Sequence, residues 1–99
     1  MRRATIVVQV DDTERANNDA LRIDPDAGYP TFGPTLEDGT GTITHRWCSW
    51  AMPEDQYAKA EELFGTGAYG RRLFDGDKYG PADVLARCNL RIASGGEGP

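Results

Sequence analysis

Residues 42–65 read TITHRWCSWAMPEDQYAKAEELFG, and we expect them to form a strand that runs directly into a helix. In the first half, β-branched and aromatic residues alternate in direction, which is typical of a strand. The alternation places Trp47 on one face of that strand and Trp50 on the other. Because one indole buries roughly 200 Å², we expect a central strand covered on both faces. The following helix would cover one face, and a loop, a second copy or a partner would cover the other.

The second half of this stretch predicts a helix over residues 53–64. Pro53 suits the first helical position, where its missing N–H would be unpaired in any case. Glu54 and Asp55 follow in the first turn, where negative charge suits the helix dipole. Gly65 is placed to end the helix. One apolar stripe runs along it, formed by Pro53, Tyr57, Ala60, Leu63 and Phe64.

The segments before this unit are less regular. Residues 4–10 predict a strand, because apolar and β-branched residues alternate there. Residues 13–21 are equally compatible with a short helix and with an irregular loop. Residues 24–41 are expected to be a loop, since prolines and glycines interrupt every possible element. We expect that loop to lie over the second face of the tryptophan strand.

Two elements are expected after the helix. Residues 71–74 are able to pair with Lys78 and Tyr79 as a small hairpin. Residues 83–93 alternate between apolar and polar positions, which favours a strand. The rival interpretation is a helix that begins at Pro81.

These elements predict an α+β fold: a small, mainly antiparallel sheet of about three to five strands, with one principal helix, about residues 53–64, packed on one face. The length of 99 residues suits a single domain, which we place at residues 1–93, followed by a flexible Gly-rich tail at residues 94–99. The net charge of −5 argues against general binding to nucleic acid or anionic membranes. No apolar run is long enough to span a bilayer, and the N-terminus does not resemble a secretory signal. We therefore expect a cytoplasmic protein.

His45, Cys48 and Cys88 are the side chains with the chemistry for a soft-metal site or a nucleophile. His45 and Cys48 point to opposite faces of their predicted strand, and structural zinc needs about four ligands. Cys88 lies in the apolar row of its predicted strand, where a reactive thiolate is disfavoured. We favour two reduced, buried thiols, with a cross-strand disulfide as the alternative. We expect no metal, no cofactor and no catalytic residue, and therefore no enzyme.

Arginines supply the candidate binding surface. If the strand of Arg46 lies beside that of Arg87 and Arg91, the three arginines share one sheet face. Arginine with exposed aromatic residues is typical of protein-binding hot spots and of sites for single-stranded nucleic acid. An ordinary solvated sheet face is the plainer alternative. The candidate binding residues are Arg46, Trp50, Arg71, Arg72, Arg87, Arg91, Tyr29 and Phe32.

The sequence thus predicts a small, non-enzymatic interaction or accessory protein that binds another protein or a second copy of itself. Its usage of Arg, Gly, Ala and Asp resembles that of a high-GC bacterium or its phage, so the hypothesis includes a phage-encoded factor with a host or viral partner. The alternative is a module that binds nucleic acid or a small molecule through an arginine-bearing sheet face.

Overall fold

The computed structural model describes residues 1–23, 25 and 32–93. Within these ranges, a five-stranded antiparallel sheet has the strand order β4-β1-β3-β2-β5. The predicted α+β fold is confirmed, and the predicted tail lies outside the described residues. The strands are β1 (Arg2–Gln9), β2 (Thr35–Glu37), β3 (Ile43–Met52), β4 (Arg72–Asp75) and β5 (Arg91–Ile92). The helices are α1 (Thr13–Ile23), α2 (Glu54–Phe64) and α3 (Pro81–Cys88), with short 3-10 turns η1 (Val10–Asp12) and η3 (Ala68–Gly70).

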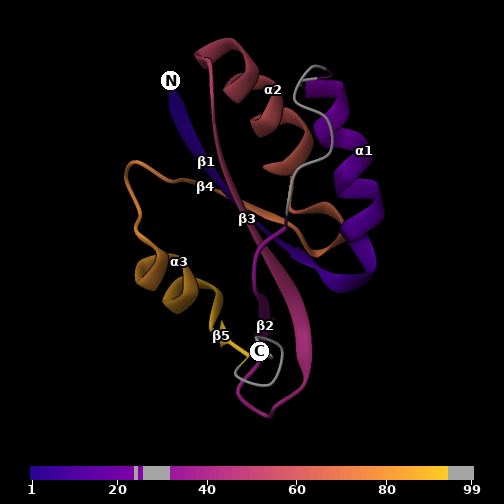
Figure 1. Cartoon of the computed structure of the whole chain (residues 1–99), viewed down its shortest axis with the longest axis vertical. Helices are drawn as coiled ribbons and strands as arrows, with labels where there is room; N and C mark the ends of the chain where they lie inside the picture. The colour runs from indigo at the N-terminus through magenta and orange to yellow at the C-terminus, as the bar shows by residue number, and fades with distance from the viewer. Residues whose placement is uncertain (24, 26–31, 94–99) are drawn as a thin grey trace.

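The sheet is covered on both faces, but unequally. α1 and α2 lie side by side on one face, here called the two-helix face, and α3 lies on the other, the α3 face (Figure 1). The larger core lies under α1 and α2 and contains Ala4, Ile6, Val8, Ala16, Ala20, Ile23, Met52, Tyr57, Ala60 and Phe64. The smaller core lies under α3 and contains Val7, Leu36, Phe74 and Val84.

β3 is the central strand, with β1 on one side and β2 on the other. Its Trp50 packs edge to face on Phe64 of α2, with the ring centroids 6.4 Å apart. Its Trp47 packs against the smaller core beneath α3. The prediction of a central strand covered on both faces is therefore confirmed, and α3 supplies the second cover. The prediction that residues 24–41 form only loop is wrong at Thr35–Glu37, which are β2. The predicted position of the loop, over the second face of β3, is wrong for Phe32, which packs in the two-helix core, whereas Pro34 does lie beside Trp47 on that second face. The rest of the predicted loop, residues 24 and 26–31, lies outside the described residues.

The helices of the two-helix face follow from their apolar spacing. α2 begins one residue after Pro53, which stands in the extended conformation as its N-cap. For residues 13–21, the helical alternative is the observed one, and α1 extends two residues further. Side chains three or four positions apart share one face of a helix. The buried sets are Ala16, Ala20 and Ile23 in α1, and Tyr57, Ala60 and Phe64 in α2.

The predicted strand at residues 83–93 is wrong, because most of this stretch is helical. α3 begins at Pro81 after an extended Gly80, and Asn89 ends it in the left-handed conformation with a φ of 57°. Proline at the first position and asparagine at a left-handed cap are both strong limits of a helix. Only Arg91–Ile92 is extended, as β5 at the edge of the sheet beside β2.

The predicted small hairpin after α2 is also wrong. β4 pairs with β1, with Phe74 opposite Thr5. The amides of Lys78 and Tyr79 both donate to the carbonyl of Asp75, at 3.1 and 2.9 Å, so the chain turns away toward α3. As a result, β4 is an edge strand of the sheet.

Candidate functional site

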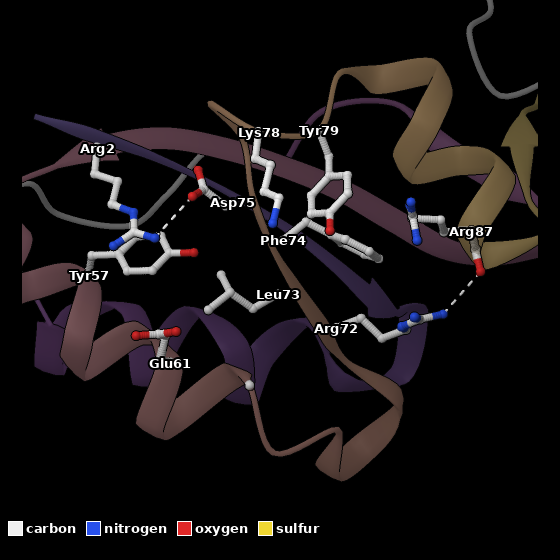
Figure 2. A pocket seen from close by; sticks show the side chains of 11 residues that line it. Arg2, Tyr57, Glu61, Arg72, Leu73, Phe74, Asp75, Lys78, Tyr79 and Arg87 are labelled. Carbon is white, nitrogen blue, oxygen red and sulfur yellow. Dashed lines mark hydrogen bonds and ion pairs between the residues drawn. The ribbon is translucent and has the colours of Figure 1, made fainter.

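The outer edge of β4 lies in an open groove of about 530 Å³. Figure 2 shows Leu73 of β4 between two groups of side chains, one near α2 and one near α3, with Phe74 beside Tyr79 of the second group. We call the first group the α2 wall and the second the α3 wall. The α2 wall consists of Arg2, Tyr57 and Glu61, and the α3 wall consists of Arg72, Lys78, Tyr79 and Arg87.

The alternating hydrogen-bond pattern of β4 leaves three of its backbone groups facing this groove. The amide of Gly76 donates to the carbonyl of Arg3 at 2.9 Å, and directly opposed antiparallel residues exchange hydrogen bonds at every second position. Arg72 and Phe74 therefore bond to β1, whereas the N–H and C=O of Leu73 and the N–H of Asp75 point outward. Within the ranges that the structure describes, no hydrogen bond occupies these three groups. An exposed row of this kind is a template for pairing with another strand.

The positive charge of Arg2, the one cation of the α2 wall, is neutralised by two carboxylates. The guanidinium of Arg2 lies 3.9 Å from the centroid of the Tyr57 ring, 2.9 Å from the carboxylate of Asp75 and 3.1 Å from that of Glu54. The hydrogen bond from Arg2 holds the pKa of Asp75 below its usual range. Burial raises the pKa of Tyr57, so its hydroxyl stays protonated. Glu61, further along α2, is exposed and gives this wall a negative charge.

The α3 wall is basic and aromatic. Tyr79 packs edge to face on Phe74, with the centroids 6.1 Å apart, and is half-buried. The guanidinium of Arg87 lies 4.6 Å from the Tyr79 centroid, and the amine of Lys78 lies 5.6 Å from it. Arg72 donates from Nη1 to the backbone carbonyl of Arg87 at 3.2 Å. The three cationic side chains are exposed; Lys78 and Arg87 lie over the Tyr79 ring, and Arg72 lies over the Phe74 ring.

The charge of the groove is opposite to the charge of the chain. Four cationic side chains line the groove with two carboxylates, Glu61 and Asp75, which leaves an excess of two positive charges. The whole chain carries −5. Of the cations on the α3 wall, Arg87 has one carboxylate contact, to Asp83 at 3.6 Å, between two half-exposed side chains. Among the described residues, Arg72 and Lys78 form no ion pair. These two charges are therefore available to a ligand.

The predicted arginine face does not form. Arg46 lies on β3, half-buried, whereas Arg87 lies on a helix and Arg91 on β5, which is separated from β3 by β2. The guanidinium of Arg91 is bonded to the carboxylate of Glu37. The face required the stretch 83–93 to be a strand beside β3, and the helix removes that condition. Of the candidate arginines, Arg72 and Arg87 are the two that the structure brings together.

Arg71 is not a surface residue at all. Its side chain is 1 % exposed and lies on the two-helix side of the sheet. It donates to Asp12 at 3.0 Å, to Asp19 at 2.7 Å and to the carbonyl of Leu63 at 2.9 Å. Buried charges occur where they are paired and hydrogen-bonded, so Arg71 joins η1, α1 and the end of α2 in the interior. It is unavailable to a partner.

Two of the aromatic candidates, Trp50 and Phe32, pack against the core and do not form a binding surface at the groove. Trp50 and Phe32 are half-buried against the two-helix core, where Trp50 contacts the ring of Phe64. Neither side chain reaches the groove at β4. The third aromatic candidate, Tyr29, lies outside the described residues.

Burial shifts the pKa values of both cysteines and of the histidine toward their neutral forms. Cys48 is buried in β3, and burial raises its pKa to about 12. Burial also raises the pKa of Cys88, which is half-buried at the end of α3. His45 bonds through Nδ1 to Thr44 at 2.8 Å, and burial lowers its pKa. At neutral pH these shifts favour two protonated thiols and a neutral imidazole.

Sequence reasoning did not identify several residues that line the groove. They are Arg2, Tyr57, Glu61, Lys78 and Tyr79. They come from separate segments, the start of β1, the middle of α2 and the turn after β4. No local pattern links these segments. The signal that would have found them is the strand order, because β4 lies at a sheet edge and its two flanks border an open groove.

Comparison with known proteins adds no functional assignment. No family model matches the chain, and neither does any curated protein or any solved structure. Among the described residues, no three His, Cys, Asp or Glu side chains gather where they could hold a metal ion. In the same part of the chain, no helix has both the length and the apolar character needed to cross a membrane.

Proposed function

We propose that this protein is a non-enzymatic interaction module that binds an extended segment of another protein along the open edge of β4. The observation that carries the proposal is the outward-facing backbone of Leu73 and Asp75 in a walled groove. In strand addition, main-chain hydrogen bonds supply affinity, and the side chains on either side of the new strand supply selectivity. Here the backbone of β4 would provide the main-chain hydrogen bonds, and the α2 and α3 walls would provide the selectivity.

The two edges of the sheet differ in how well they are protected. β5 has two residues, and the Arg91 side chain reaches back over β2 to Glu37 and toward the carbonyl of Gly39. β4 has four residues, with the half-buried Leu73 near its centre. Natural proteins protect idle edges with short strands and charged side chains. β4 is therefore the edge that better suits pairing.

A nucleic-acid site is the second candidate, because the α3 wall combines three cations with Tyr79. Positively charged grooves with aromatic side chains are what single strands bind. Against it stand Glu61 and Asp75, whose carboxylates line the same groove and would face the phosphates. A peptide strand uses the backbone groups of β4 and tolerates both carboxylates, so the protein partner is favoured.

For the biological role of this binding, the proposal is the one that the sequence suggested. An accessory factor acting in the cytoplasm on a host or viral protein is compatible with such a groove. The proposed cytoplasmic location rests on the lack of a bilayer-spanning apolar run and of a secretory signal pattern in the sequence, and the proposed phage origin rests on its amino-acid usage.

The test compares Leu73→Pro with Leu73→Ala in capture from the cells that produce the protein. Proline removes the outward N–H of residue 73 and leaves the hydrogen bonds between β4 and β1 in place. Edge strands tolerate proline at positions whose N–H faces solvent. Alanine removes the same side-chain bulk but keeps the N–H, so it is the matched control. We expect wild type and Leu73→Ala to recover the same partner and Leu73→Pro to lose it. Hydrogen exchange should show the amides of Leu73 and Asp75 protected in the complex.

Two results would overturn the proposal. One is a stoichiometric partner that all three proteins capture equally. The other is a complex in which the amides of Leu73 and Asp75 exchange as fast as in the isolated chain.

A further inference from the structure

We infer that the segment bound along β4 is acidic and alternates, with carboxylates facing the α3 wall and apolar side chains facing Leu73. The inference rests on the proposed strand addition and specifies the partner's chemistry. It follows from the alternation of side chains across a sheet and from the different charges of the two walls.

Alternation fixes which wall each residue of the segment meets. In β4, Phe74 lies in the core of the α3 face, whereas Leu73 packs against the core of the two-helix face. A strand added beside β4 continues the same pleat, so its successive side chains also point to opposite faces. Every second residue of the segment therefore lies near the α3 wall, and the residues between lie near the α2 wall.

The α3 wall has unsatisfied positive charge. Arg72 and Lys78 are exposed and form no ion pair with a described residue, and the one carboxylate contact of Arg87 is long, at 3.6 Å. A carboxylate arriving here gains charge-assisted hydrogen bonds without first breaking a close ion pair. Arginine also presents a planar fork that matches a carboxylate. Acidic side chains are therefore the best match on this side.

The α2 wall selects the opposite character. Its cation, Arg2, is already bonded to Asp75 and Glu54 and lies over the Tyr57 ring. Leu73 is half-buried and presents apolar surface between the walls. Glu61 lies exposed on the same side and would repel a second carboxylate. Apolar side chains are favoured next to Leu73 and acidic ones are disfavoured.

A second copy of this chain is a poor occupant of the groove. Two β4 edges that pair antiparallel about a two-fold axis perpendicular to the sheet keep the same face on the same side. The two α3 walls would then stand next to each other, and the three cations of each, Arg72, Lys78 and Arg87, would repel those of the other. The partner is therefore a different, acidic chain rather than a homodimer mate.

The probes are end-blocked, fluorescently labelled peptides of roughly eight residues, long enough to span β4 at about 3.3 Å per residue. One alternates valine with glutamate. A second has the same composition with its glutamates gathered at one end, and a third has lysine in place of glutamate. Single-stranded oligo(dT) and the unlabelled protein itself are included as the other possible occupants. Fluorescence anisotropy measures each Kd.

The variants separate charge from backbone pairing. Lys78→Glu reverses a charge on the α3 wall, and Lys59→Glu makes the same change on the exposed surface of α2, outside the groove. We expect the alternating peptide to bind most tightly. Lys78→Glu should weaken it about tenfold, Lys59→Glu should leave it nearly unchanged, and Leu73→Pro should remove the binding. Added salt should weaken binding, because the charges that meet are exposed.

Four results would overturn the inference. They are no binding of the alternating peptide, equal binding of the peptide with gathered glutamates, tighter binding of the lysine peptide, and a native partner whose mapped segment is not acidic. The proposed function would survive each of them if capture of the native partner still depended on the N–H of Leu73. Binding of oligo(dT) that is lost in Lys78→Glu but kept in Leu73→Pro would overturn both. Self-association lost in Leu73→Pro would replace the acidic partner by a second copy.

Discussion

The guanidinium of Arg71 lies 3.0 Å from the carboxylate of Asp12, with both side chains almost completely buried. Asp19 completes the arrangement at 2.7 Å from Nη1. These contacts tie the end of β1, through η1, to the segment that leads into β4. The position of the β4 edge therefore depends on a charge cluster in the interior on the two-helix side of the sheet.

Arg71→Met is expected to lower the free energy of unfolding by about 3–5 kcal/mol, because it leaves Asp12 buried without its charge partner. Urea denaturation followed by tryptophan fluorescence measures the loss. Arg22→Met, at an exposed position of α1, is the matched control and should change stability by less than about 0.5 kcal/mol. Equal stability of the two variants would show that the ion pairs with Asp12 and Asp19 are not needed.

The pair formed by Arg2 and Asp75 makes a prediction about pH. Because the folded state lowers the pKa of Asp75, the pair stabilises the fold above the ordinary pKa of a carboxyl, about 3.9. That contribution is lost as the pH falls through the lower folded value. Asp75→Asn should therefore reduce stability at neutral pH and flatten the fall in stability below about pH 4. Asp55→Asn makes the same charge change on α2 outside the groove, and a similar flattening in that control would contradict the assignment to Asp75.

The sequence predicted what its local patterns encode. Trp47 and Trp50 on opposite faces indicated a central, doubly covered strand, and Pro53 with Gly65 marked the limits of α2 to within a residue. In contrast, Val84 and Cys88 are four apart, a spacing that fits both a period of two and the helical repeat. Alternation could not decide between strand and helix there.

The candidate site was harder to predict, because it depends on strand order. Nothing local in the sequence places β4 at an edge, and the groove exists only because β4 pairs with β1 and leaves its other side open. Arg71 and Arg72 show the same limit. They are adjacent in sequence, and since neighbouring residues of an extended chain point to opposite faces, one is buried with Asp12 and the other lies on the α3 wall.

The left-handed cap of α3 makes the third prediction. Asn89 has a φ of 57°, and its amide donates to the carbonyl of Ala86 at 3.2 Å. Glycine adopts this conformation without steric cost because it has no Cβ. In alanine the Cβ crowds the following carbonyl oxygen, and no polar side chain is present to compensate by a local hydrogen bond. Asn89→Gly should leave the free energy of unfolding unchanged within about 0.5 kcal/mol or raise it, and Asn89→Ala should lower it by about 1 kcal/mol. Thermal unfolding followed by circular dichroism measures both, and the reverse ranking would contradict a left-handed Asn89.

Alkaline pH tests the burial of Cys48. Burial raises its pKa to about 12 in the folded protein, whereas an unfolded thiol titrates near 8.5. A group with a raised folded pKa contributes its full stability below the unfolded pKa, and that contribution is lost as the pH rises toward the folded value. Between about pH 8.5 and pH 12, stability should therefore fall more steeply in wild type than in Cys48→Ala, by up to about 1.4 kcal/mol per pH unit.

Two features make this alkaline comparison decisive. Burial raises the pKa of Tyr57 as well, but its contribution is common to both proteins and cancels when the slopes are compared. Alanine also removes packed volume, which shifts the whole curve without changing its slope. Urea midpoints measured at about half-unit steps between pH 8 and pH 11 give the two slopes. Parallel curves would mean that the thiol of Cys48 ionises as readily in the fold as in the unfolded chain, and Cys48 would then not be buried as the structure places it.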